Sequence, residues 1–173
     1  MSDGFSGVLG VSRALLKILR VLNLVAGALL IICVIGSFPF EPRLLESFAK
    51  MPRVTDAAFL MNALRIWVLI GLPAIAAIHV ILSRLLEMVG TVRSGDPFVP
   101  ENGARLKMIA WCLLATQLLH LAFGAMARVV NEAGGEVSWS FSTNGWLAVV
   151  LLFVLARVFE EGTRMREELG TMI

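Results

Sequence analysis

Residues 21–40 read VLNLVAGALLIICVIGSFPF, a stretch without one charged side chain. A helix of about 20 apolar residues crosses the roughly 30 Å hydrocarbon core of a bilayer. Lipid also requires each crossing segment to bond its own backbone groups, so a continuous apolar run of this kind indicates a helix. Together with three further apolar runs, this stretch predicts an all-α, polytopic membrane protein. The chain is expected to form a single domain over 1–173, with four transmembrane helices in a bundle. The predicted spans are 21–40, 57–83, 106–127 and 144–159.

The composition of the 173-residue chain supports this class and excludes others. Apolar residues make up 58% and charged residues 16%, whereas soluble domains have about 25% charged residues. So few charged side chains cannot cover a soluble globule. The net charge of +2 argues against direct nucleic-acid binding. The two cysteines do not form a CxxC pair, which excludes a disulfide framework and a thiolate metal site.

Lysine and arginine are spread unevenly over the flanks of the predicted spans, and in membrane proteins they accumulate on the cytoplasmic side. Ten lie before the first span, between the second and third, or after the fourth, whereas four lie on the opposite flanks. We therefore expect both termini, the loop 84–105 and the tail 160–173 in the cytoplasm. The ten are Arg13, Lys17, Arg20, Arg84, Arg93, Arg105, Lys107, Arg157, Arg164 and Arg166; the four are Arg43, Lys50, Arg53 and Arg128.

Two local patterns concern the second half of the molecule. Val137–Ser142 alternates with period two, which predicts an extended or interfacial stretch ahead of the fourth helix. Trp139 and Trp146 are expected in the aromatic belt at the membrane surface. The segments 83–87 and 156–160 also resemble each other (SRLLE and ARVFE), which suggests a repeat of two hairpins, with coincidence as the alternative.

Polar side chains in the outer halves of two spans form one candidate site, because such groups are costly in lipid. Asn62 and Arg65 are three residues apart on the second span, and Gln117 and His120 are three apart on the third. If the two faces meet, these four residues line an outer polar pocket. The alternative is that Arg65 reaches outward to the surface while Gln117 and His120 join helices by hydrogen bonds.

Nearer the inner side, Asn23 and His79 have similar depth and are expected to form an interhelical hydrogen bond, with a proton relay as the alternative. Sequence motifs for catalysis are absent: there is no phosphate-binding glycine loop, no GxSxG and no HExxH. With two histidines and no neighbouring acid, a triad or zinc site has too few members. We therefore expect no enzyme activity, no metal and no cofactor.

The predicted loop contains the stretch Gly95-x-Pro97-Phe98, followed by Asn102 and Arg105-Leu106. Asn102 is expected to cap the third span's helix. The tail contains Phe159-x-x-Gly162 and Glu168, and ends in Thr171-Met172-Ile173. In these residues the chain resembles the bacterial membrane protein family catalogued as domain of unknown function 2975. The resemblance implies a four-span inner-membrane protein without established chemistry, often encoded beside a small helix-turn-helix DNA-binding protein.

Two functional hypotheses follow. The first is a non-enzymatic regulator in the lipid bilayer whose cytoplasmic side binds a small helix-turn-helix transcription regulator. The second is a small transporter or an auxiliary transporter subunit, which requires a homo-oligomer because four helices leave little room for a pathway. The docking motif of the first hypothesis comprises Gly95, Pro97, Phe98, Asn102, Arg105, Leu106, Phe159, Gly162 and Glu168.

Overall fold

The computed structural model describes residues 2–50, 54 and 56–170, and every regular element in this part of the chain is an α-helix. The helices are α1 (Ser2–Ser37), α2 (Glu41–Ala49), α3 (Ala57–Arg93), α4 (Pro100–Glu132) and α5 (Thr143–Gly170). The all-α class is thus confirmed. Three of these helices, α1, α3 and α4, are long and apolar enough to cross a membrane.

The fourth predicted span lies in α5, which is not among the three candidate membrane-crossing helices of the described chain. Its apolar part, Trp146–Ala156, is short, and a charged segment begins at Arg157. Four crossing helices are therefore not confirmed. The physical reason is the length of apolar chain, since about 20 residues are needed for a helix to cross the hydrocarbon core.

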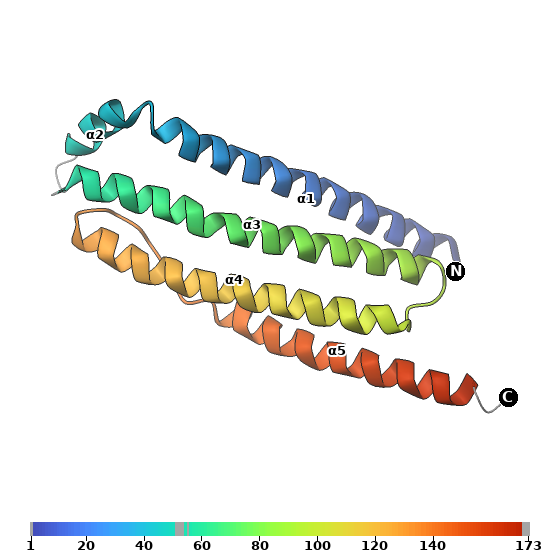
Figure 1. Ribbon diagram of the computed structural model, residues 1–173. Helices are drawn as coiled ribbons and strands as arrows, with labels where there is room; N and C mark the ends of the chain where they lie inside the picture. Colours follow the sequence, from blue (N-terminus) through green and yellow to red (C-terminus); the bar gives the residue numbers. More distant parts are fainter. Residues whose placement is uncertain (1, 51–53, 55, 171–173) are drawn as a thin grey trace.

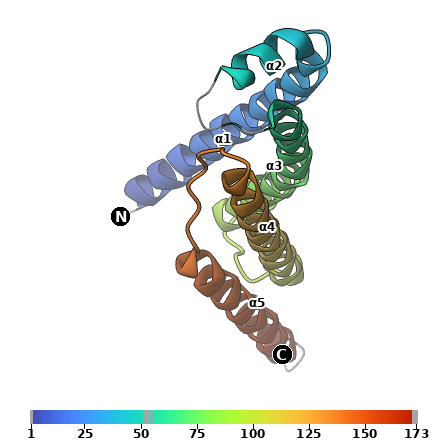
Figure 2. The ribbon, with the colours of Figure 1, turned by 90° about the vertical axis from the view of Figure 1, so that its left-hand side faces the viewer.

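The four long helices lie in one open row, and the predicted four-helix bundle is not confirmed (Figures 1 and 2). Contacts join α1 to α3, α3 to α4 and α4 to α5, and the short α2 lies on α3. Lipid is as apolar as the side chains it covers, so no hydrophobic force requires the row to close. The start of α1, the connection 94–99 and the end of α5 share one end of the molecule, which we call the loop end (Figure 1). The opposite end is called the α2 end.

Prolines set two helix boundaries differently from the sequence-based expectation. α1 stops at Ser37 and a turn follows over 38–40, because the residue before Pro39 is disfavoured in a helix. The predicted loop 84–105 is helical except at 94–99, where Gly95 has a φ of +87°, a backbone conformation that favours glycine. α4 then begins at Pro100, since proline is well suited to the first position of a helix.

Residues 135–142 form a non-helical connection, as expected for Val137–Ser142. The connection runs back along α4 from the α2 end, so that α5 starts part-way along α4 (Figure 1). Trp139 packs against α4, and its expected place in the aromatic belt stays a prediction. Its Nε1 donates a hydrogen bond to the carbonyl of His120 at 3.0 Å, and its ring lies over Gly124. The absence of a side chain at Gly124 provides the space for the indole ring.

Candidate functional site

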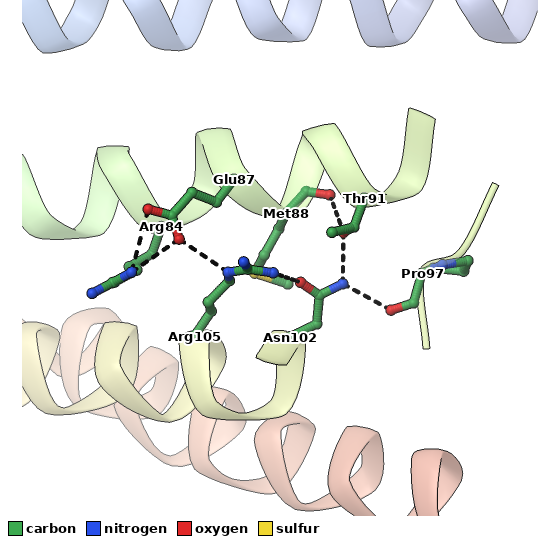
Figure 3. A network of polar contacts seen from close by, with 7 residues as sticks. All are labelled: Arg84, Glu87, Met88, Thr91, Pro97, Asn102 and Arg105. Carbon is green, nitrogen blue, oxygen red and sulfur yellow. Dashed lines mark hydrogen bonds and ion pairs between the residues drawn. The ribbon is translucent and has the colours of Figure 1, made fainter. Parts of the chain in front are cut away.

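Asn102 is fully buried in the first turn of α4 and is the centre of a polar network at the loop end (Figure 3). Its Nδ2 donates to Thr91 Oγ1 and to the Pro97 carbonyl, both at 2.8 Å. Its Oδ1 accepts from Arg105 Nη1 at 2.9 Å, and Thr91 Oγ1 donates in turn to the carbonyl of Met88. A buried amide is costly unless it is hydrogen-bonded, and here both ends of the amide are bonded. One side chain thus joins α3, the connection and α4.

This network corrects the expectation that Asn102 caps α4. The helix begins two residues earlier, with Val99 at the N-cap position and no side-chain capping bond. Because Pro100 has no N–H to satisfy, the helix start does not need the Asn102 side chain. That side chain binds the connection and the neighbouring helix instead.

Glu87 extends the network along α3. Its Oε2 accepts hydrogen bonds from Arg84 Nη1 at 2.9 Å and from Arg105 Nε at 3.0 Å. Glu87 lies beyond Ser83, where the apolar run of α3 ends. The hydrogen bond from Arg84 lowers the pKa of Glu87, partial burial opposes this effect, and the bond from Arg105 lowers the pKa further. The carboxylate is therefore ionised and holds two arginines together.

Replacing Glu87 by glutamine is expected to reduce stability at pH 7 by at most about 1 kcal/mol, because the ion pairs lie at the surface. A lowered pKa means that the ionised form favours the folded state. This contribution is present above the unfolded-state pKa and is lost as the pH falls through the folded-state pKa. Unfolding midpoints of wild type and Glu87→Gln in detergent should therefore differ at pH 7 and converge in acid. Glu46→Gln, which breaks an exposed pair with Lys50, is the control, and a pH-independent difference for Glu87→Gln would contradict the prediction.

The final part of α5 packs against the connection. Phe98 stacks on Phe159 with ring centroids 5.4 Å apart, and Gly162 faces the Phe98 ring. Arg166 forms an ion pair with Asp96. These contacts fix the charged part of α5 to the α3–α4 hairpin, so it is not a free tail.

The predicted docking residues therefore lie mainly in internal contacts. Asn102 and Leu106 are buried, and Arg105 binds Glu87 and Asn102. Phe98 remains 46% exposed. Glu168 is exposed, with its Oε1 3.4 Å from Arg164 Nε. Residues 171–173, the end of the motif in the tail, lie outside the described residues.

Arg65 of the predicted outer pocket faces α1 and α2. Its Nε donates to Ser37 Oγ at 3.0 Å, and its Nη2 donates to the Ser37 carbonyl at 3.2 Å. The same Nη2 lies 2.8 Å from Glu41 Oε2, and the guanidinium carbon is 4.2 Å from the ring centroid of Phe38. Arg65 thus binds a carbonyl at the end of α1 and finds its counter-charge on α2.

The other three predicted pocket residues lie elsewhere. Gln117 packs over Gly145, where an added Cβ would be 2.3 Å from Nε2, and the His120 ring is 5.6 Å from that of Trp139. Asn62 is exposed on α3. The structure therefore does not bring the four residues together. A separate, mainly apolar cavity of about 620 Å³ lies at the α2 end, and none of the four lines it.

The predicted bond between Asn23 and His79 is also replaced by another contact. Asn23 Nδ2 donates to the carbonyl of Ile75 on α3 at 3.0 Å. An added Cβ at Gly27 would be 3.0 Å from Ile75 Cγ2, so the helices are close enough here for a side chain to reach the backbone. In the described part of the chain, His79 Nδ1 is buried without a hydrogen-bond partner.

The family model described as "Protein of unknown function (DUF2975)" matches residues 16–173, which include every member of the network. The chain belongs to this family. No curated protein and no solved structure matches the chain. In this DUF2975 protein, the residues from which the resemblance was inferred hold the α3–α4 hairpin and α5 together at the loop end.

Proposed function

We propose that the protein crosses the bacterial inner membrane four times, with α5 and the chain before it forming the fourth crossing. The start of α1 and the end of α5 share one end of the molecule, which fits an even number of crossings (Figure 1). The same end has most of the lysine and arginine, which favours a cytoplasmic position. A fluorescent protein fused after Ile173 should therefore fluoresce, whereas alkaline phosphatase fused there should be inactive. The reverse result would contradict this orientation.

At this cytoplasmic end we propose a non-enzymatic regulatory role, in which the protein binds a small helix-turn-helix DNA-binding partner. The observation that supports it is the face formed where α5 packs against the connection 94–99. Phe98 is 46% and Met165 52% exposed on this face, among charged side chains. Exposed apolar residues with a polar rim are typical of protein-binding surfaces. The kind of partner is taken from the family resemblance.

The test is co-purification with the helix-turn-helix protein encoded beside the gene. Met165→Glu places a charge on the exposed face without touching the network and should reduce recovery at least tenfold. Lys50→Glu is the control, because it changes an exposed charge at the α2 end and should leave recovery unchanged. Equal recovery with both variants, or the absence of such a neighbouring gene, would contradict the proposal.

The transporter hypothesis has less support. Three of its expected lining residues, Arg65, Gln117 and His120, make contacts in different parts of the row, and the fourth, Asn62, is exposed on α3. A transport pathway would also need a homo-oligomer, since one row of helices encloses no path by itself.

A further inference from the structure

The connection before α5 has main-chain groups without hydrogen bonds. Within the described part of the chain, no N–H or C=O group of residues 138–141 is hydrogen-bonded. The flanking residues differ, since Val137 N and O bind the Asn131 side chain at 2.7 and 2.8 Å. The carbonyl of Ser142 accepts from Gly145 N at 3.2 Å. Four consecutive residues thus have no partner for their backbone groups.

In the proposed four-crossing arrangement, the deeper part of this segment lies within the hydrocarbon core. Arg65 and Arg84 enclose the uncharged stretch 66–83 of α3 and are about 28 Å apart at 1.5 Å per residue, close to the core thickness. Trp67, two residues inside Arg65 on α3, stacks on Phe123 of α4 with ring centroids 4.7 Å apart. Phe123 therefore lies at nearly the same depth as Arg65, slightly closer to the membrane centre. Gln117 lies one and two-thirds turns further, about 12 Å below the Arg65 level. The segment starts above the Arg65 level, because Val137 binds Asn131, which is eight residues or about 12 Å above Phe123 on α4. From there it descends past the Arg65 level to Gly145, beside Gln117.

Contacts with α4 fix that position of the segment. The Trp139 ring covers Gly124, and Trp139 Nε1 binds the His120 carbonyl. Gly145 lies against the Gln117 side chain, so α5 begins near mid-depth. The chain from Trp139 to Gly145 therefore descends beside the crossing part of α4.

Polar side chains accompany the unbonded backbone. Ser138 and Ser140 are exposed, and they alternate with Trp139, which points toward α4. The Gln117 side chain, at the deep end of the segment, makes no hydrogen bond within the residues that the structure describes. Hydroxyls, an amide and backbone groups therefore lie together at one edge of the row.

Lipid cannot satisfy these groups, because each unbonded polar group in hydrocarbon costs several kcal/mol, and non-helical backbone occurs there only inside protein or beside water. We propose that the outer half of the fourth crossing lines a water-filled notch that opens at the α2 end and reaches Gln117. The proposal rests on the four-crossing arrangement proposed above. A second copy is a poorer occupant, since copies of like orientation are related by an axis along the membrane normal. Around such an axis the unbonded backbone groups of one copy face the same groups of the other copy. Donors then face donors, and they cannot bond to each other.

Cysteine accessibility tests the notch. In a Cys33→Ala, Cys112→Ala background, Ser140→Cys is placed in the notch and Ser138→Cys at its outer opening. Leu118→Cys and Leu121→Cys are the depth-matched controls, exposed on α4 outside the notch. Intact cells are treated with a charged, membrane-impermeant maleimide, which reacts with thiolates in water. The serine-site cysteines should react at least tenfold faster than the leucine-site cysteines, and monodisperse elution in detergent confirms that each variant folds.

Three results would overturn the proposal. Equal and slow reaction at all four positions would show that lipid or protein covers the segment. Disulfide-linked dimers of Ser140→Cys without maleimide labelling would identify a second copy as the cover. Labelling only in inside-out vesicles would show that the notch opens to the cytoplasm, and it would contradict the proposed orientation as well. The pull-down with Met165→Glu is independent of all three.

Discussion

A Gly124→Leu variant is expected to be less stable than wild type by about 1–3 kcal/mol, the usual cost of overpacking a filled site. An added Cβ at this position would lie 2.3–2.7 Å from three atoms of the Trp139 ring, so the ring must move. Movement of the ring would break its hydrogen bond to the His120 carbonyl and release the chain that leads into α5. A helical glycine replaced by a better helix former normally gains stability, so a loss here measures the steric conflict. The measurement is the unfolding midpoint in detergent.

Gly90→Leu provides the matched control, because nothing lies within 4 Å of a Cβ added at that position of α3. The control should leave the midpoint unchanged or raise it. In a Trp139→Ala background, the loss caused by Gly124→Leu should shrink, since two residues in contact show non-additive effects. If Gly124→Leu lowers the stability as much in the Trp139→Ala background as in wild type, the steric conflict does not involve the Trp139 ring.

Asn102→Leu is expected to have a comparable or larger effect, about 2–4 kcal/mol. Leucine is close in size to asparagine, but it leaves the Pro97 carbonyl and Thr91 Oγ1 without the donor that binds them. Each buried group left without a partner costs about 1–3 kcal/mol. The connection 94–99 should become accessible, so cleavage after Arg93 by trypsin should accelerate together with the fall in the unfolding midpoint.

Asn62→Leu is the control for this change, because Asn62 is exposed on α3 and is not a member of the network. Asn102→Asp separates the two ends of the amide. It keeps the acceptor for Arg105 and loses the donor to Pro97 and Thr91, so it should also destabilise. If Asn102→Leu and Asn62→Leu have the same unfolding midpoint and the same rate of cleavage by trypsin, the network has no role in holding the connection.

The apolar parts of α1, α3 and α4 could be predicted from the sequence because each depends on a local property, whereas α2 and the helical end of α3 were not predicted. Apolar runs without charge located α1, α3 and α4, and the alternation in 137–142 located the break before α5. The arrangement in an open row could not be predicted in this way. Apolar side chains are equally stable against lipid and against another helix, so composition does not determine which faces of two helices meet.

Contacts between distant residues limited the prediction of the candidate site. Asn102 and Arg105 were identified from the motif, but their partners Glu87 and Thr91 were not. Those partners are four residues apart on one face of α3, a spacing that also occurs in any solvated helix. Their pairing depends on the length and turn of the connection, which sets the register of α3 against α4. For the same reason the contacts of Arg65 with Ser37 and Glu41 could not be predicted from the sequence.

The open row also bears on how the chain is made. Each long helix packs on the one that precedes or follows it among the long helices, so no interface has to wait for a distant part of the chain to be synthesised. Local contacts of this kind form quickly and leave few competing pairings. As the ribosome delivers each helix to the membrane, its docking surface is already in place, and assembly can keep pace with translation.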